Sequence, residues 1–308
     1  MVTNDRRFAP NHVLVAVDAE GLADHAIRAG LEVANRLDAR IELLHAAGSA
    51  LRNWDAPDDP RAVSNAEDST SKAWKAMTSH IAPLLEATAT RARVEDIVRV
   101  VHGPPAKVIL DRARELDADV IFLGSHRHKD VLDFGSTVRA VLARAPKSVW
   151  VQATAWERIR TILVPIDLSP DSLRALSHAC ALANVFGARV RAVNVFQTGG
   201  YMMATWPDYP DYGKGYVIAD VRRKQIGEFE RALAAFDWMG APHDAEFVDG
   251  EPVEKVLELS STCDLIVLGT HGRTGLSAVL LGNVAYSVLK RAAKPVLAIR
   301  HPEREFVT

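Results

Sequence analysis

Short apolar runs alternate along the chain with longer segments whose apolar residues recur every three or four positions. The runs at residues 12–18 and 160–167 are rich in Val, Ile and Leu, which is typical of strands buried on both faces of a parallel sheet. Asp24 to Leu37 and Ser169 to Phe186 show the period of an amphipathic helix. This alternation predicts an α/β fold with doubly wound parallel sheets and right-handed crossovers.

The whole pattern occurs twice. The run that ends at Asp18 resembles the run that ends at Asp167, and the run that ends at Gly124 resembles the one that ends at Gly269. The copies are about 150 residues apart, which is the length of one ordinary domain. We therefore expect two tandem domains, 1–152 and 158–308, with the boundary in the polar stretch between them.

Composition narrows the function only slightly. Hydrophobic residues make up 48% of the chain and the formal net charge is −2, so nothing favours nucleic acid or an anionic membrane as partner. No apolar run is long enough to span a membrane, and the first residues lack the apolar stretch of a signal peptide. Cys180 and Cys263 lack metal-ligand spacing and predict buried, reduced thiols. A cytoplasmic protein is expected.

In an open parallel sheet, ligands bind beyond the carboxyl ends of the strands, where the strand order reverses. Asp167 follows the first strand of the second copy, and Gly269 and Gly272 follow its fourth strand, with Gly282-Asn283 at the start of the last helix. Glycine lets a ligand approach the main chain, and the first N–H groups of a helix attract anions. This arrangement predicts a phosphate site, to which Arg273 could add a mobile positive charge.

A simpler interpretation of the same residues stays open. Glycines near a strand end are common turn residues, and Asp167 could start the next helix through the turn Asp-Leu-Ser-Pro-Asp. In the alternative role, Asp167 would accept hydrogen bonds from a ribose hydroxyl or an adenine amino group. Spacing alone does not decide between the two roles.

The first copy differs where the phosphates would lie. Arg127 stands in place of Gly272, and Gly124 and Gly135 lie two residues closer together than Gly269 and Gly282. We therefore expect that this copy does not hold ATP in the same way, although Arg127 and Lys129 could meet a smaller anion.

Two further features allow more than one interpretation. His126 and His128 alternate near Asp130, which suits zinc, but a solvated polar loop is favoured and no metal ligand is assigned. The segment Gly199 to Tyr216 combines glycine, methionine and aromatic residues, and predicts a packed lid in preference to a wall of an apolar pocket. Because no P-loop, nucleophile elbow or zinc-protease motif occurs, no catalytic residue is assigned.

The pattern Gly269-x2-Gly272-x9-Gly282-Asn283, together with Ile162-Leu-Val-Pro-Ile-Asp167, resembles the universal stress protein family. The resemblance covers roughly residues 10–152 and 158–302, is stronger in the second copy, and is closest to the tandem, E-type members. One departure is Asn283, because the family pattern has Ser or Thr after the last glycine.

The resemblance implies a fold, a ligand and a mode of association. Each domain would hold a five-stranded parallel sheet in the order 3-2-1-4-5 with helices on both faces. ATP, with or without Mg²⁺, would bind to the second copy. The last strands, residues 149–152 and 296–300, would pair inside the chain as a pseudo-dimer, and a homodimer could also form. Carried over to this chain, the nucleotide-binding residues are Pro165, Ile166, Asp167, Val195, Leu268, Gly269, Thr270, Gly272, Arg273, Gly282, Asn283 and Val284.

Three functions follow, from different classes. The leading one is a non-catalytic stress-response protein that senses ATP through its second domain. The second is a slow ATPase or an enzyme that transfers adenylate. The third is a scaffold for an apolar metabolite or a partner protein, suggested by the segment Gly199 to Tyr216.

Overall fold

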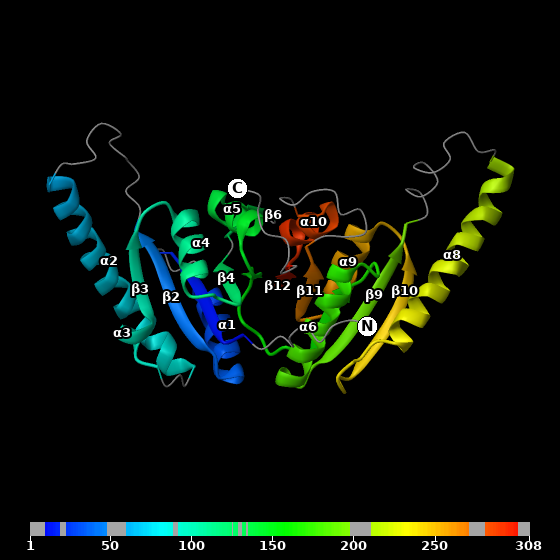
Figure 1. Cartoon of the computed structure of the whole chain (residues 1–308), viewed down its shortest axis with the longest axis horizontal. Coiled ribbons are helices and arrows are strands. Elements are labelled where there is room, and N and C mark those ends of the chain that lie inside the picture. The colour runs from blue at the N-terminus through cyan, green and yellow to red at the C-terminus, as the bar shows by residue number, and fades with distance from the viewer. Residues whose placement is uncertain are drawn as a thin grey trace. The chain divides into compact units, whose positions relative to one another are not determined.

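The computed structural model divides the chain into two compact units, which Figure 1 shows in blue to green and in green to red. One unit is built mainly from Ala9–Glu157 and the other mainly from Arg158–Leu276 and Leu281–Ile299. At 60–68, 126–128, 131–133 and 211–216 only the backbone is described. The residues that the structure describes are 10–18, 23–47, 60–88, 92–124, 126–128, 131–133, 135–197, 211–270 and 281–300.

The described part of the N-terminal unit contains a five-stranded parallel sheet in the order β3-β2-β1-β4-β7. Its strands are β1 (His12–Val17), β2 (Arg40–Ala47), β3 (Val98–His102), β4 (Val120–Gly124) and β7 (Ser148–Gln152). Its helices are α1 (Asp24–Leu37), α2 (Pro60–Ala87), α3 (Val94–Ile97), α4 (Pro105–Glu115) and α5 (Ser136–Arg144). A separate antiparallel hairpin consists of β5 (His126–His128) and β6 (Val131–Asp133).

The described part of the C-terminal unit repeats this sheet in the order β10-β9-β8-β11-β12. Its strands are β8 (Thr161–Pro165), β9 (Arg189–Phe196), β10 (His243–Asp249), β11 (Leu265–Gly269) and β12 (Val296–Ile299). Its helices are α6 (Pro170–Phe186), α8 (Asp211–Ala234), α9 (Pro252–Ser260) and α10 (Asn283–Arg291). The expected order 3-2-1-4-5 is confirmed in both units.

The reversal of strand order at the first strand of each sheet places helices on both faces. Since crossovers are right-handed, the connections that run from β8 to β10 put α6 and α8 on one face, and those that run from β10 to β12 put α9 and α10 on the other. The contacts agree, because α6 packs on β8 and β11 while α9 and α10 pack on each other. The strands are buried on both faces, which explains their nearly continuous apolar sequence.

Matched aspartates fasten the start of the first strand in each unit. Asp119 Oδ2 accepts hydrogen bonds from the main-chain N–H groups of Asn11 (2.7 Å) and His12 (3.1 Å). Asp264 Oδ2 accepts the equivalent bonds from Arg160 (2.8 Å) and Thr161 (2.9 Å). The repeat therefore extends from sequence pattern to individual hydrogen bonds.

Both cysteines are buried and unpaired, as the sequence predicts. Burial, with the nearby charge of Asp237, raises the pKa of Cys180 to about 12, and burial also raises the pKa of Cys263. Only the thiolate is an efficient nucleophile, and the raised pKa disfavours it at neutral and mildly alkaline pH.

We expect neither thiol to react with a thiol-specific chromogenic disulfide reagent at pH 8 until the protein unfolds. The absorbance of the coloured thiol that the reagent releases is measured with and without denaturant. Two equivalents per chain, one for each cysteine, should appear only in denaturant. Rapid reaction of either thiol in the folded protein would contradict the burial.

Among the residues that the structure describes, no helix is both long enough and apolar enough to cross a bilayer.

Candidate functional site

A cavity of about 440 Å³ opens at the carboxyl ends of β8, β9 and β11, where the strand order of the C-terminal unit reverses. The first residues of α9 and α10, Pro252 and Asn283, also line it. Of the twelve nucleotide-binding residues that the sequence predicts, ten lie around this cavity: Pro165, Ile166, Asp167, Val195, Leu268, Gly269, Thr270, Gly282, Asn283 and Val284. The other two, Gly272 and Arg273, fall outside the described residues.

Asp167 builds the turn that starts α6. Its Oδ1 accepts hydrogen bonds from the main-chain N–H (3.0 Å) and the hydroxyl (2.5 Å) of Ser169, which in turn caps the helix by accepting from the N–H of Ser172. Leu168 between them adopts a left-handed conformation, with φ of 65°. The turn role that the sequence leaves open is therefore present, and Asp167 also lines the cavity.

Gly269 is required by the packing of the protein itself. A Cβ atom at this position would lie 2.7 Å from the carbonyl carbon of Asp171 and 2.8 Å from its oxygen. The sequence predicts that this glycine lets a phosphate approach the main chain. The structure shows a second role, because the missing side chain lets α6 pack close to the end of β11.

The segment between Gly269 and Gly282, here called the glycine loop, begins and ends at the carboxyl end of β11. The N–H of Gly282 donates to the carbonyl of Thr270 (2.8 Å), and the N–H of Thr270 donates to the carbonyl of Ile299 (3.1 Å). Residues 271–280 between these ends are outside the described part of the chain. Gly282 precedes α10 with no side-chain cap among the described residues, and the first N–H groups of a helix carry partial positive charge.

An ion pair joins the two helices that border the cavity. The guanidinium of Arg291 in α10 donates two hydrogen bonds, of 2.5 and 2.7 Å, to the carboxylate of Glu254 in α9. This pairing lowers the pKa of Glu254 and raises that of Arg291. Because both side chains are largely exposed, the pair contributes little to stability.

Asn194 is a functional candidate that the sequence reasoning misses. It is buried in β9, and its Nδ2 donates to the carbonyl of Ile166 (2.9 Å), while the N–H of Ile166 donates to Val193 (2.8 Å). These bonds fix the end of the first strand at the cavity. The available signal was one polar residue inside the apolar run of residues 192–196, at the position that His45 takes in the first copy.

Replacing Asn194 with Leu should destabilise the C-terminal unit by about 1–3 kcal/mol, because a buried carbonyl would lose its partner. Asn194→His should recover at least half of that loss, because the matched His45 makes the same bond to Val17 in the N-terminal unit. Urea unfolding followed by circular dichroism measures both variants. Equal losses for Leu and His would show that the hydrogen bond is not the cause.

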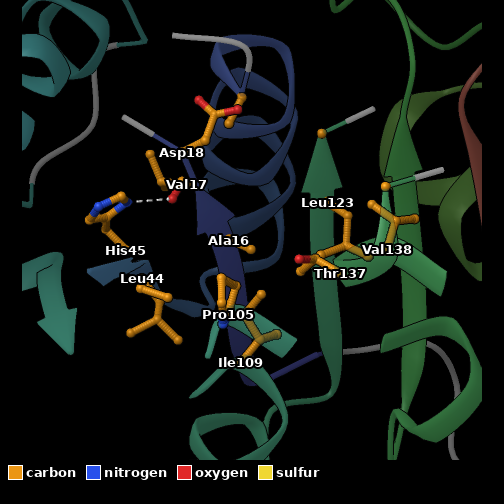
Figure 2. Close-up of a pocket in the computed structure, with 14 residues that line it drawn as sticks. Ala16, Val17, Asp18, Leu44, His45, Pro105, Ile109, Leu123, Thr137 and Val138 are labelled. Atoms are coloured by element: carbon orange, nitrogen blue, oxygen red, sulfur yellow. Dashed lines mark hydrogen bonds between the residues drawn. The ribbon is translucent and has the colours of Figure 1, made fainter. Parts of the chain in front are cut away.

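The N-terminal unit also has a cavity at the equivalent place, as Figure 2 shows. Its volume is about 250 Å³, compared with about 440 Å³ in the C-terminal unit. The sequence predicts that the segment after β4 differs from the glycine-rich segment of the second copy. It favours a polar loop around His126 and His128, whereas the backbone of residues 126–128 and 131–133 forms the hairpin β5–β6.

The zinc alternative for His126 and His128 concerns side chains outside the described residues, as does most of Gly199 to Tyr216. Among the side chains that the structure describes, no group of His, Cys, Asp or Glu could hold a metal ion.

The class of protein is defined by two tandem doubly wound units, each with a cavity where its strand order reverses. The universal stress protein family model matches residues 10–152 and 158–300. The chain therefore belongs to the universal stress protein family.

Individual relatives agree with this assignment. A universal stress protein of Mycolicibacterium smegmatis is 27% identical over 306 residues, covering 94% of this chain and 96% of the relative. One from Methanocaldococcus jannaschii is 33% identical over 150 residues, 47% of this chain and 85% of the relative. The crystal structure of a universal stress protein from Archaeoglobus fulgidus shares the fold, with a TM-score of 0.64 and 17% identity, covering 94% of this chain and 98% of that chain.

Proposed function

We propose that the C-terminal unit binds an adenine nucleotide, ATP, and that the protein is a non-catalytic sensor or regulator in a stress response. The observation that carries the proposal is that ten of the residues that the family resemblance implies, from the ends of β8, β9, β11 and the start of α10, line one cavity. These residues come from distant parts of the sequence, so their proximity is a property of the fold.

The two sides of the cavity suit the two parts of the ligand. Ile166 and Val195 offer apolar surface to a base, and the carboxylate of Asp167 lies beside them for a ribose hydroxyl or an amino group. The start of α10 at Gly282 and Asn283 offers main-chain N–H groups and the positive helix end to phosphates.

The size and donor set of the cavity fit a nucleotide. Sites for small ligands usually enclose about 300–1,000 Å³, and the cavity of about 440 Å³ lies in that range. Mg²⁺ keeps several water ligands and binds mainly through phosphate oxygens with one or two carboxylates. Asp167 is the one carboxylate that the described lining residues supply, so a metal ion would depend largely on the ligand.

The lining argues against catalysis by the described residues. Among the residues that the structure describes, this lining contains no Lys, Arg, His, Cys or Glu, and Oδ1 of Asp167 is held by Ser169. A general base needs a site that can take up a proton from the attacking group. Binding without turnover is therefore the function that this geometry supports best.

Isothermal titration of the purified chain with ATP and Mg²⁺ tests the proposal. We expect saturable binding, and we expect Gly272→Arg, which copies the residue of the first domain, to remove it. No heat and no retained nucleotide at high protein concentration would contradict the proposal. Sustained ATP hydrolysis that disappears in Asp167→Ala would replace it with the slow-ATPase alternative.

A further inference from the structure

The cavity of the N-terminal unit keeps one half of the arrangement found in the C-terminal unit. Asp18 follows β1 as Asp167 follows β8, and both line their cavities. Ala46 in β2 and Val195 in β9 occupy the same register, because they pair with Val101 and Val248 of the neighbouring strands. The side that would meet a nucleoside is therefore present in both units.

A hydrogen bond preserves the shape of this side. Nδ1 of His45 lies 2.9 Å from the carbonyl oxygen of Val17, and since a carbonyl only accepts, Nδ1 carries the proton. Figure 2 shows this contact at the edge of the cavity. Asn194 makes the corresponding bond to Ile166. The equivalent strand end is therefore held in each unit, by a different side chain.

The other half of the N-terminal cavity is different. After β4 the backbone pairs as a hairpin, with Arg127 opposite Leu132, where the C-terminal unit has its glycine loop. The volume of about 250 Å³ falls just below the roughly 300–1,000 Å³ of sites for drug-sized ligands. The smaller volume and the hairpin together reduce the room for a triphosphate chain.

The rest of the described lining is mainly apolar. Leu44, Ile109 and Leu123 supply apolar walls, and Thr137 replaces Val284 with a hydroxyl group. Figure 2 shows the oxygen of Thr137 turned toward the space between Leu123 and Ile109. A hydroxyl can donate to and accept from the polar edge of a base or a sugar.

We propose that the N-terminal cavity binds an unphosphorylated nucleoside, with adenosine as the probe, and discriminates against ATP. This inference rests on the proposed nucleotide site of the C-terminal unit, whose nucleoside side it matches. One chain would then bind two ligands that contain the same nucleoside, the triphosphate in one unit and the free nucleoside in the other.

The test uses the full chain with the C-terminal cavity filled by Val195→Phe. We expect this variant to bind one adenosine per chain in equilibrium dialysis, and to bind ATP at least tenfold more weakly than adenosine. Adding Ala46→Phe, at the matched position of the N-terminal cavity, should weaken adenosine binding at least tenfold. Thr137→Phe fills the same cavity from α5 and serves as a second variant, and circular dichroism checks that each variant is folded.

The outcomes separate this inference from the proposed function. If the wild-type chain binds ATP but Val195→Phe binds no adenosine, the inference is wrong and the proposed function stands. Equal affinity of Val195→Phe for ATP and adenosine, or adenosine binding that survives both Ala46→Phe and Thr137→Phe, would also overturn the inference. Adenosine binding lost with Ala46→Phe in a chain that binds no ATP would support the N-terminal site and refute the C-terminal one.

Discussion

Val195→Phe should weaken ATP binding to the chain about 100-fold, which corresponds to about 2.7 kcal/mol. Val195 is half-buried at the end of β9 and lines the cavity of about 440 Å³. A phenyl ring at this position would occupy the space between the strand ends that we assign to the base. Since the side chain stands at the open end of the sheet, the loss of binding should exceed any loss of stability.

Ala46→Phe is the matched control for this variant. It makes the same change at the same strand register of the N-terminal unit, so ATP binding should stay within about twofold of wild type. Titration calorimetry of both variants gives the comparison. Equal weakening by the two substitutions would contradict the assignment of ATP to the C-terminal unit, and unchanged binding by Val195→Phe would place ATP elsewhere.

Gly269→Ala should have the largest effect on stability, a loss of about 2–3 kcal/mol in the C-terminal unit. The added Cβ would lie 2.7 Å from the main-chain carbon of Asp171, and this atom belongs to the start of α6, which packs closely on β11. Backbone atoms in a packed interior cannot move away as a flexible side chain can. Scanning calorimetry should therefore show one unfolding transition at a lower temperature.

Gly135→Ala is a control at a loop glycine that packing does not constrain. Gly135 precedes α5 as Gly282 precedes α10, its φ of −49° suits any residue, and a Cβ there meets nothing within 4 Å. Its effect on stability should stay below about 0.5 kcal/mol. A loss as large as that of Gly269→Ala would show that glycine is needed at these loops for a reason other than packing.

Much of the fold could be predicted because it depends on periodic burial. The runs before Asp18 and Asp167 read as buried strands, and the repeat between them indicated two equivalent units. The strand order came from resemblance to a family, because apolar strands do not encode which neighbour they pair with. Once that order is given, the carboxyl ends of β8, β9 and β11 must meet, which is why ten predicted residues converge.

The contacts within the site could not be predicted in the same way. The bonds of Asn194 and His45 to a neighbouring strand end depend on tertiary register, which a single polar residue within an apolar strand does not reveal. The need for glycine at position 269 comes from Asp171, which is almost 100 residues away in the sequence and adjacent only in the fold. The N-terminal cavity goes beyond the sequence prediction, because the changed glycine loop predicted only that ATP is not held in the same way, and the strand ends preserve a smaller cavity.

The stoichiometry of ATP in the intact chain is the most direct test of the account. Native mass spectrometry of the purified protein, titrated with ATP and Mg²⁺, should show one nucleotide per chain at saturation, and that nucleotide should be absent from Val195→Phe. Two nucleotides per chain would mean that the hairpin of the N-terminal unit does not exclude the triphosphate. No bound nucleotide would mean that the cavity beside Asp167 and Asn283 serves another ligand.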